Sequence, residues 1–380
     1  MNILALIAGS ILVLAILLDA FETIVLPRRV TRSFRFTALF YRITWRPWAA
    51  LARFVPSPRR RESYLSYFGP LSLIVLLGLW AFALIVGFAL LQYGAGTHVH
   101  LFSRNSGFGA LVYFSGSTFF TLGYGDVVPL TGATRVLAVL ESGVGFGFLA
   151  MVIGYLPVIY SSFSRREVEI SLLDARAGSP PTAQEFLSRM AGAHNQPLLD
   201  RFLHEWEHWA AEVLESHISY PVLALYRSQH INQSWLGALT TILDVSALTI
   251  VGIDGIPSNQ ARLTFAMARH AVVDLAQVVG SHYRSEAPDR LPPQDLANLR
   301  QVLAANGLQL RAGEEAERKL LALRRMYEPY VHAMAATLLL NLPTWSSAVK
   351  VKDNWRSSPW DRIIAEKEGS APVAVGEEHF

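Results

Sequence analysis

Three long apolar stretches dominate the first 163 residues, and connecting segments separate them. They cover residues 3–26, about 67–93 and about 133–163, and Glu141 is the one internal charge of the third beyond Arg135 at its start. A helix needs about 20 predominantly apolar residues to cross the hydrocarbon core of a bilayer. The pattern therefore predicts three transmembrane helices.

The remaining pattern is different, because charges occur throughout residues 164–380. The expected organisation has five parts. They are an N-terminal transmembrane helix (1–26), a basic, aromatic-rich linker helix at the cytoplasmic face or membrane interface (27–66), a domain with the second and third spans (67–164), a helical cytoplasmic domain (165–360) and a flexible tail (361–380).

The first stretch has a cleaved signal peptide as its alternative. A signal peptide has a basic start and a small-residue cleavage site. Here the chain starts Met1–Asn2, and Asp19, Glu22 and Pro27 stand where the cleavage site would lie. The sequence favours a retained helix.

Arginine sets the expected orientation. Between Pro27 and Ser66 only Glu62 is acidic, against ten arginines: Arg28, Arg29, Arg32, Arg35, Arg42, Arg46, Arg53, Arg59, Arg60 and Arg61. Loops rich in Lys and Arg stay in the cytoplasm. We therefore expect a multi-pass protein of the cell membrane, with its N-terminus outside and its C-terminal half in the cytoplasm.

The linker mixes these arginines with aromatic residues over residues 34–56. Such a mixture is typical of a helix that lies in the membrane interface near anionic lipid. A helix packed on the cytoplasmic domain is the alternative. Arg29, Arg32 and Arg35 repeat at every third position, but three arginines without a preceding helical bundle do not favour a voltage sensor. The candidate lipid-facing residues are Arg28, Arg29, Arg32, Arg35, Arg42 and Arg46.

Composition supports the membrane assignment. Hydrophobic residues make up 52% of the chain and charged residues 17%, whereas about 25% is typical of soluble domains. The net charge of +3 gives no reason to expect a nucleic-acid partner. The chain has no cysteine, which excludes disulfides and thiolate chemistry. We expect an all-α membrane protein that is not an enzyme and needs no cofactor.

Between the second and third spans, residues 108–120 are apolar but too short to cross a membrane. A short helix that enters the membrane and stops halfway fits this length. Non-helical backbone at that depth is tolerated only where it lines a pathway enclosed by protein. The next six residues are Thr121, Leu122, Gly123, Tyr124, Gly125 and Asp126.

These six residues suit the binding of dehydrated potassium ions. Backbone carbonyls form an oxygen cage if they all point inward, and the required torsions favour glycine at Gly123 and Gly125. Thr121 adds a hydroxyl oxygen, while a carboxylate at Asp126 attracts cations to the outer mouth. The candidate neighbours that support Tyr124 and the filter mouth are Tyr113 and Phe114.

The order Thr-Leu-Gly-Tyr-Gly-Asp resembles the potassium-channel signature, and the surrounding helices are similar to the two-helix pore of that family. The resemblance covers about residues 67–163 and implies a homotetramer, because four such loops surround one ion path. Two positions depart from the usual pattern: Leu122 replaces valine, and Phe120 replaces a small polar residue.

The third span resembles the inner helix of bacterial inward-rectifier-type channels, since Glu141 precedes Gly145 by four residues. The resemblance implies a gating hinge at Gly145, or one spread over Gly143 and Gly147; close helix packing is the alternative. Glu141 either faces the cavity or bonds behind the pore helix to a nearby serine or threonine. The candidates for that bond are Ser115, Ser117 and Thr118.

The second half shows helical periodicity and few strand signals. It contains no glycine-rich nucleotide-binding motif after a strand. The run of alternating strands of inward-rectifier cytoplasmic domains is also missing from the pattern. Residues 236–256 are the most apolar part of this half, with Asp244 and Asp254 inside. We expect a buried helix there, with a fourth membrane span as the alternative.

The sequence His204-Glu205-Trp206-Glu207-His208 matches the zinc-protease pattern, in which two histidines share a metal. A chance match on an amphipathic helix is the simpler interpretation. Glu212 and His217 are the only candidates for a third ligand. His204 and His208 are therefore weak metal candidates beside potassium at the filter.

The sequence thus predicts a homotetrameric potassium channel that is gated by inner-helix bending under the control of a cytoplasmic domain. A non-selective cation channel of the same fold and a membrane-tethered metal-binding protein are the alternatives. Protons, lipid, calcium or a small ligand of the cytoplasmic domain all stay open as the gating stimulus.

Overall fold

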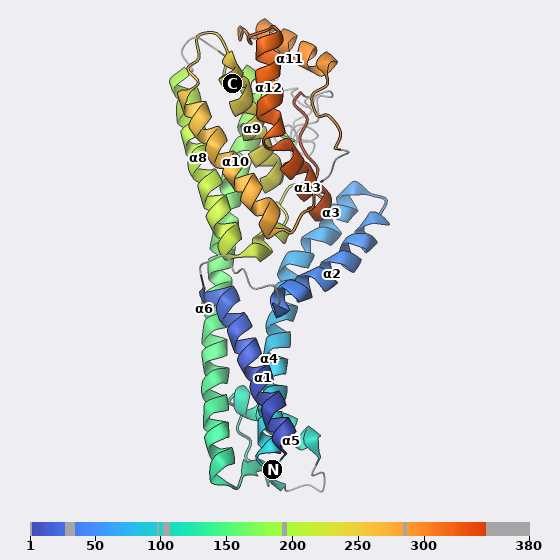
Figure 1. Ribbon diagram of the computed structural model, residues 1–380, viewed down its shortest axis with the longest axis vertical. Coiled ribbons are helices and arrows are strands. Elements are labelled where there is room, and N and C mark those ends of the chain that lie inside the picture. The colour runs from blue at the N-terminus through green and yellow to red at the C-terminus, as the bar shows by residue number, and fades with distance from the viewer. Residues whose placement is uncertain are drawn as a thin grey trace, which may run out of the picture. The chain divides into compact units, whose positions relative to one another are not determined.

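The computed structural model describes residues 2–26, 35–96, 99–101, 107–191, 196–283 and 287–346, and it is built almost entirely of helices (Figure 1). The chain divides into two compact units. Unit 1 comprises Met1–Phe163 and Ile218–Tyr226, and unit 2 comprises Ser164–His217 and Arg227–Phe380. The segment Ile218–Tyr226, which we assigned to the cytoplasmic domain from sequence, therefore packs with the first half of the chain.

Unit 1 holds the apolar helices. Its elements are α1 (Ile3–Ala20), a π-helical turn (Phe21–Val25), α2 (Phe36–Arg53), α3 (Pro58–Ser66), α4 (Phe68–Gly94), β1 (Val99–Leu101), α5 (Phe108–Phe119), β2 (Val127–Pro129), the first part of α6 (Gly132–Ala177) and a 3-10 turn (Pro221–Leu225). The helix predicted to end near residue 163 instead continues to Ala177.

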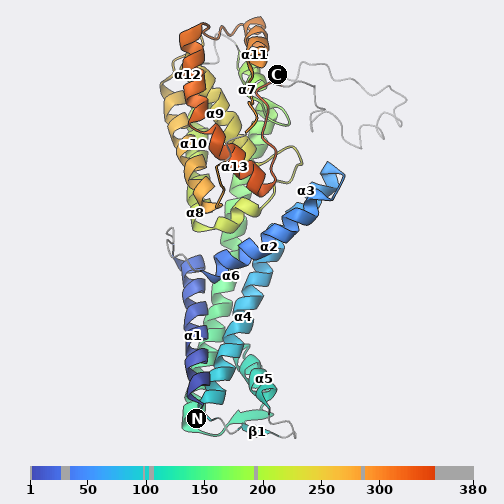
Figure 2. The same ribbon diagram turned by 45° about the vertical axis from the view of Figure 1, so that its right-hand side comes forward.

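Glycines let α1 and α4 approach closely, and the two helices lie side by side in Figures 1 and 2. A methyl group at Gly9 would lie 2.7 Å from the Gly87 carbonyl oxygen, and one at Gly94 would lie 2.9 Å from the Asn2 carbonyl oxygen. Small residues at such positions allow tight packing where no hydrophobic effect drives helices together. The N-terminal helix is thus an integral part of unit 1.

The end of α1 is joined to α2 and α4 by a buried carboxylate. Asp19 accepts hydrogen bonds from the Thr37 backbone N–H at 3.1 Å and from the Thr37 hydroxyl at 2.5 Å. The Trp80 indole N–H donates to the same carboxylate at 3.1 Å. Since Thr37 lies in the first turn of α2, the negative charge also complements the helix dipole.

The predicted linker helix forms two helices, α2 and α3, and not one. Several of their aromatic residues pack inward: Trp48 stacks on Tyr64 at 4.5 Å, and Trp45 meets Phe68 of α4 edge-on at 4.9 Å. Large apolar side chains are exposed instead, namely Leu39, Ile43 and Leu51 of α2 and Phe54 directly after it.

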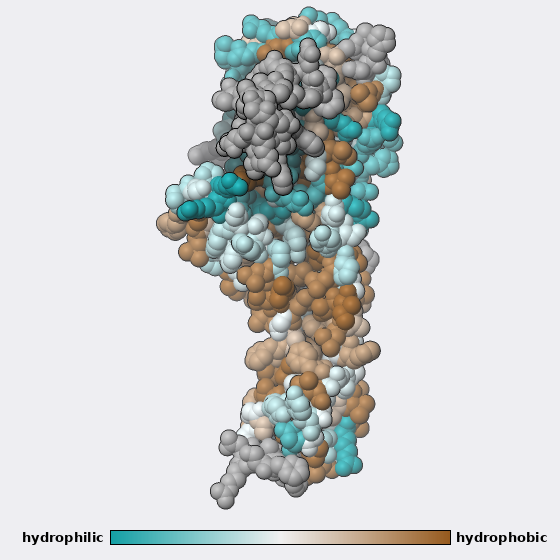
Figure 3. Space-filling model, turned by 180° about the vertical axis from the view of Figure 1, so that it is seen from behind, coloured by the Kyte–Doolittle hydropathy of each residue, from teal (hydrophilic) through white to brown (hydrophobic). Residues whose placement is uncertain are grey.

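On the face shown in Figure 3, hydrophobic side chains dominate the surface of the spanning helices. Leu4 and Ile11 of α1, Ile74 of α4 and Ile153 of α6 are each more than 60% exposed. Among the described residues, four helices are long and apolar enough to cross a membrane, and three of them lie in or begin in unit 1. An apolar surface of this kind suits contact with lipid, and the chain is an all-α membrane protein.

Unit 2 is a helical domain. It contains the end of α6, α7 (Ala183–Arg189), most of α8 (Gln196–Ser219), α9 (Trp235–Gly252), α10 (Asn259–Val278), α11 (Pro293–Ala305), α12 (Glu314–Arg325) and α13 (Glu328–Leu338). Polar caps begin two of these helices: Thr182 accepts from the Glu185 N–H, and Ser234 accepts from the Gly237 N–H.

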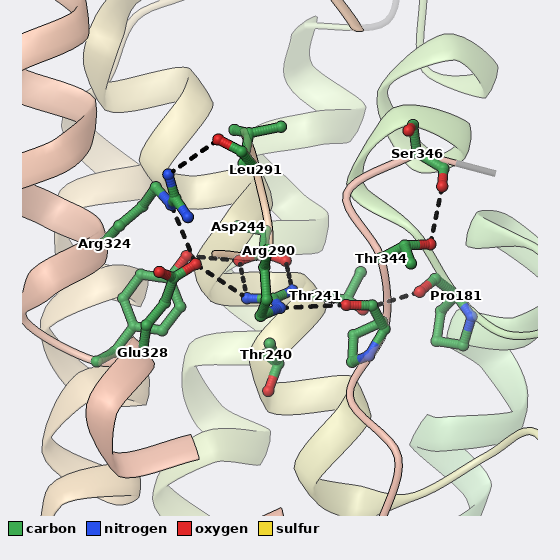
Figure 4. A network of polar contacts seen from close by, with 12 residues as sticks. Pro181, Thr240, Thr241, Asp244, Arg290, Leu291, Arg324, Glu328, Thr344 and Ser346 are labelled. Atoms are coloured by element: carbon green, nitrogen blue, oxygen red, sulfur yellow. Dashed lines mark hydrogen bonds and ion pairs between the residues drawn. The ribbon is translucent and has the colours of Figure 1, made fainter. Parts of the chain in front are cut away.

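The centre of unit 2 is α9, the fourth candidate span, which is buried on all sides among the other helices. Its carboxylate, Asp244, is paired with Arg290, whose Nη1 lies 3.1 Å from Oδ1 (Figure 4). The Tyr327 hydroxyl donates to Asp244, and Arg290 also reaches Glu328 at 3.4 Å. Partners from the segment before α11 and from the turn before α13 satisfy this charge, as expected of a core helix in a protein domain.

Candidate ion-conduction site

The pore helix α5 lies between the apolar helices α4 and α6, and the six-residue loop 121–126 follows its C-terminal end. The loop begins on the last turn of the helix, because the Thr121 N–H donates to the Thr118 carbonyl and the Leu122 N–H donates to the Ser117 carbonyl, at 3.0 and 2.8 Å. The negative end of the helix dipole therefore faces the start of the loop, which favours cations there.

Backbone torsions alternate along the loop. Thr121, Gly123 and Gly125 have positive φ angles of 57°, 59° and 79°, whereas Leu122 and Tyr124 between them do not. Alternating left- and right-handed torsions turn successive peptide groups to the same side. A row of carbonyls on one side of the chain is the arrangement that replaces the hydration shell of a potassium ion.

Thr121 is notable, because positive φ is costly for a residue with a Cβ atom. Strain of this kind, about 1–3 kcal/mol, concentrates at functional sites. All six loop residues are exposed in the single chain, with Tyr124 71% exposed.

Ser117 holds the centre of the loop, and sequence considerations did not assign it this role. Its hydroxyl oxygen accepts a 3.2 Å hydrogen bond from the Gly123 backbone N–H. Ser117 itself is buried. An amide that points to Ser117 leaves the carbonyls free to point away from the pore helix.

The two predicted supporting residues on α5 lie in different surroundings. The Tyr113 side chain is exposed and lies beside the Asp126 carboxylate, at the end of the loop. Phe114 is buried inside the chain. Beyond Asp126, β2 pairs antiparallel with β1, with His100 opposite Val128, which ties the loop exit to the segment that follows α4.

Glu141 lies behind the pore helix and is fully buried. Its carboxylate accepts hydrogen bonds from the Ser115 hydroxyl and from the Gln92 side-chain amide, the latter at 3.4 Å. The cavity-facing position considered for Glu141 is therefore wrong, and its alternative, a bond to Ser115, is what the structure has. Gln92 was missed because it lies 49 residues away in sequence.

The three hinge candidates differ in their surroundings. A methyl group at Gly145 would lie 2.0 Å from the Phe119 carbonyl oxygen. A methyl group at Gly143 or Gly147 would have no neighbouring atom within 4 Å. Gly145 thus permits close packing of α6 on α5, while Gly143 and Gly147 are free of such contact. Pro157, which removes one hydrogen bond from α6, was not considered from sequence.

The basic candidates fall into three groups. Arg28, Arg29 and Arg32 lie outside the described residues. Arg35 turns toward protein groups, with its guanidinium 3.7 Å from the Glu22 carboxylate and 3.2 Å from the Thr23 hydroxyl. Arg42 and Arg46 are exposed on α2, next to its exposed apolar residues.

His204 and His208 are exposed on α8, with their rings edge-on at 4.7 Å. His204 Nδ1 lies 3.9 Å from Glu207, and the possible third ligand His217 is buried elsewhere on the helix. Within the described ranges, no group of three or more His, Asp or Glu side chains is placed to hold a metal ion.

Comparison with known proteins agrees with the helix–loop–helix geometry. Residues 74–161 match the family model described as "Ion channel". This segment of the chain resembles an ion channel. The matched segment begins in α4, contains α5 and the loop 121–126, and ends within α6, which supports ion-channel function for unit 1.

A curated relative extends the similarity beyond the ion-channel segment. The uncharacterized membrane protein YdjJ of Bacillus subtilis (strain 168) is 24% identical over 268 residues, which cover 68% of this chain and 76% of that protein. No solved structure matches the chain.

Proposed function

We propose that four copies of this chain form a potassium-selective channel in the cell membrane. The observation that carries the proposal is the alternation of positive φ at Thr121, Gly123 and Gly125 in a loop at the end of a membrane-embedded half-helix. One chain supplies one row of carbonyls. A cage around an ion needs rows from several chains, and four loops are the known solution for potassium.

Conduction then follows from the loop chemistry. A potassium ion loses its water shell as it enters, and the carbonyls of residues 121–125 supply replacement oxygens. The Asp126 carboxylate raises the local cation concentration at the mouth, and the α5 dipole favours a cation at the inner end.

Gating is assigned to bending of α6, with unit 2 as its controller. Open space surrounds Gly143 and Gly147, whereas Gly145 is tightly packed. This favours bending of α6 at Gly143 or Gly147, on either side of Gly145. In this proposal the N-terminus lies outside the cell and unit 2 in the cytoplasm, as the arginines of residues 27–66 favour. Anionic lipid contacting Arg42 and Arg46 is a further proposed partner.

A non-selective cation channel of the same architecture is the competing function. The departure at Phe120 favours it, because this side chain borders the loop that would select the ion. Selectivity depends on the geometry of that loop, and packing around it affects the geometry.

Reconstitution of the purified protein in planar bilayers tests both functions. We expect reversal potentials under bi-ionic potassium and sodium to show strong preference for potassium. Gly123→Ala places a Cβ at positive φ and should reduce that preference, whereas Gly109→Ala on α5, with open space around it and negative φ, should not. Equal permeability in the unmodified channel, or unchanged selectivity in Gly123→Ala, would contradict the proposal.

A further inference from the structure

A buried polar cluster in unit 2 joins the three chain segments that connect it with unit 1. The chain passes between the units after Phe163, after His217 and after Tyr226. Arg166 and Glu167 follow the first passage on α6, His217 ends the α8 part before the second, and Ser228 follows the third. Arg166 and Glu167 therefore lie on α6 just after this helix passes from unit 1 to unit 2.

The contacts of His217 define its protonation state. Its Nδ1 lies 2.8 Å from the Val213 carbonyl oxygen, and its Nε2 lies 3.1 Å from Arg166 Nη1. A carbonyl only accepts and a guanidinium only donates. Nδ1 must therefore carry the proton while Nε2 accepts, which makes the imidazole neutral.

The charged groups near the His217 imidazole come from α6. From α6 it faces Arg166, which pairs with Glu167 at 2.9 Å, and Glu167 accepts a 3.1 Å bond from Ser228. From its own helix, Ser216 lies 3.2 Å from Nδ1, and the Trp235 ring of α9 lies 5.1 Å away. His217 itself is fully buried.

A second proton on His217 is incompatible with this arrangement. It would place an N–H group against the Arg166 guanidinium, so that two donors and two positive charges would meet without water between them. Burial and the Arg166 charge accordingly lower the pKa of His217 well below its usual range. The proton can bind only when His217 and Arg166 separate.

We propose that His217 is a proton-binding site through which acidification of the cytoplasmic side regulates opening of the channel. The role in gating rests on the proposed channel function, but the proton site itself does not. A proton on His217 selects a state in which Arg166 of α6 is detached from α8. In that state the end of the pore-lining helix is no longer held by this contact.

Linkage gives the size of the effect. Once it is separated from Arg166, His217 has an ordinary pKa of about 6.5. Below that pH, and above the lowered pKa of the joined state, the ratio of separated to joined states rises about tenfold per pH unit. His217 and Arg166 therefore stay in contact at neutral pH, and this contact weakens below about pH 6.5.

Deuterium exchange at the imidazole Cε1 carbon, measured by mass spectrometry on the unmodified full-length protein, tests the proton site directly. We expect His217 to exchange with an apparent pKa below that of an unperturbed histidine, and Arg166→Gln to raise it. Exchange of His217 with the pKa of an unperturbed histidine would overturn the proposal.

Bilayer recordings with the cytoplasmic-side pH stepped from 7.5 to 5.5 test the role in gating. We expect open probability to change with pH in the unmodified channel, and His217→Gln to abolish at least nine-tenths of that change. His204→Gln, on the same helix, should keep it. Unchanged pH dependence in His217→Gln, or none in the unmodified channel, would overturn the gating role.

Failure of the proposed function is distinguishable from failure of this inference. A protein that conducts no ions would contradict the channel function, and the imidazole exchange would still decide the proton site. A conducting channel with an ordinary His217 titration would contradict the proton site alone.

Discussion

The carbonyl oxygen of Phe119 lies so close to Gly145 that a methyl group there would be 2.0 Å from it. One turn earlier on both helices, Ser115 donates to Glu141. The pore helix and the inner helix therefore meet at two points with the same four-residue spacing. These contacts fix the register of α5, and hence the start of the loop 121–126, relative to α6.

Gly145→Ala is expected to disrupt this packing. The added methyl group cannot fit against a backbone carbonyl, so α5 and α6 must move apart, at a cost of about 1–3 kcal/mol. Thermal unfolding of the detergent-solubilised protein should show a lower midpoint, and potassium flux into liposomes should fall. Gly154→Ala is the matched control, because it lies on the same helix and a methyl group there would meet no atom within 4 Å. A Gly145→Ala protein as stable and active as this control would refute the close contact.

Ser117→Ala is expected to weaken ion selectivity more than stability. It removes the acceptor of the Gly123 N–H, so the middle of the loop loses the bond that orients its peptide group. The permeability ratio of potassium to sodium, from bi-ionic reversal potentials, should fall several-fold. Ser72→Ala removes an equally buried hydroxyl that bonds to the Gly69 carbonyl of α4, away from the loop. Selectivity that falls equally in both variants would argue against a specific role of Ser117.

The spans and the loop were predictable because they depend on local pattern. The length of an apolar run decides whether it can cross a membrane, and glycine at 123 and 125 points to unusual torsions whatever lies nearby. The partners of Glu141 were only partly predictable. Ser115 lies on the adjacent pore helix and was among the candidates, whereas Gln92 is brought there by the packing of α4, which no local pattern encodes.

The linker illustrates the same limit. Its aromatic residues and arginines indicated a helix at the membrane interface, but periodicity alone did not say which face is covered. In the structure Trp45 and Trp48 pack on Phe68, and Arg35 approaches Glu22. Leu39, Ile43 and Phe54 are exposed instead. The choice depends on where α3 and α4 lie, which is tertiary information.

Trp80→Phe is expected to destabilise unit 1. Phenylalanine cannot donate to Asp19, and the buried carboxylate then keeps only the bonds from Thr37. Loss of a hydrogen bond to a charged group costs about 1.5–3 kcal/mol. Denaturation of the solubilised protein, followed by tryptophan fluorescence, would measure the change.

Trp206→Phe is the control for that experiment. Trp206 is as deeply buried as Trp80, and its indole nitrogen has no hydrogen-bond partner within the described part of the chain. It should therefore lose packing but no hydrogen bond, and the loss of stability should be smaller. Equal losses in the two variants would show that the Asp19 bond contributes little.

Single cysteines can locate α9 relative to the membrane, because the chain has none of its own. Leu198→Cys and Leu263→Cys place exposed thiols before and after α9, at positions 47% and 56% exposed. If α9 is the core of unit 2, as its pairing of Asp244 with Arg290 requires, both thiols lie on the same side. A membrane-impermeant maleimide added to inside-out vesicles should label both, and the same reagent added to intact cells should label neither.

Leu130→Cys, in the connection between the ion-binding loop and α6, should give the reverse result, because it lies on the far side of the α6 span. Labelling of Leu198→Cys and Leu263→Cys from opposite sides would mean that α9 crosses the membrane.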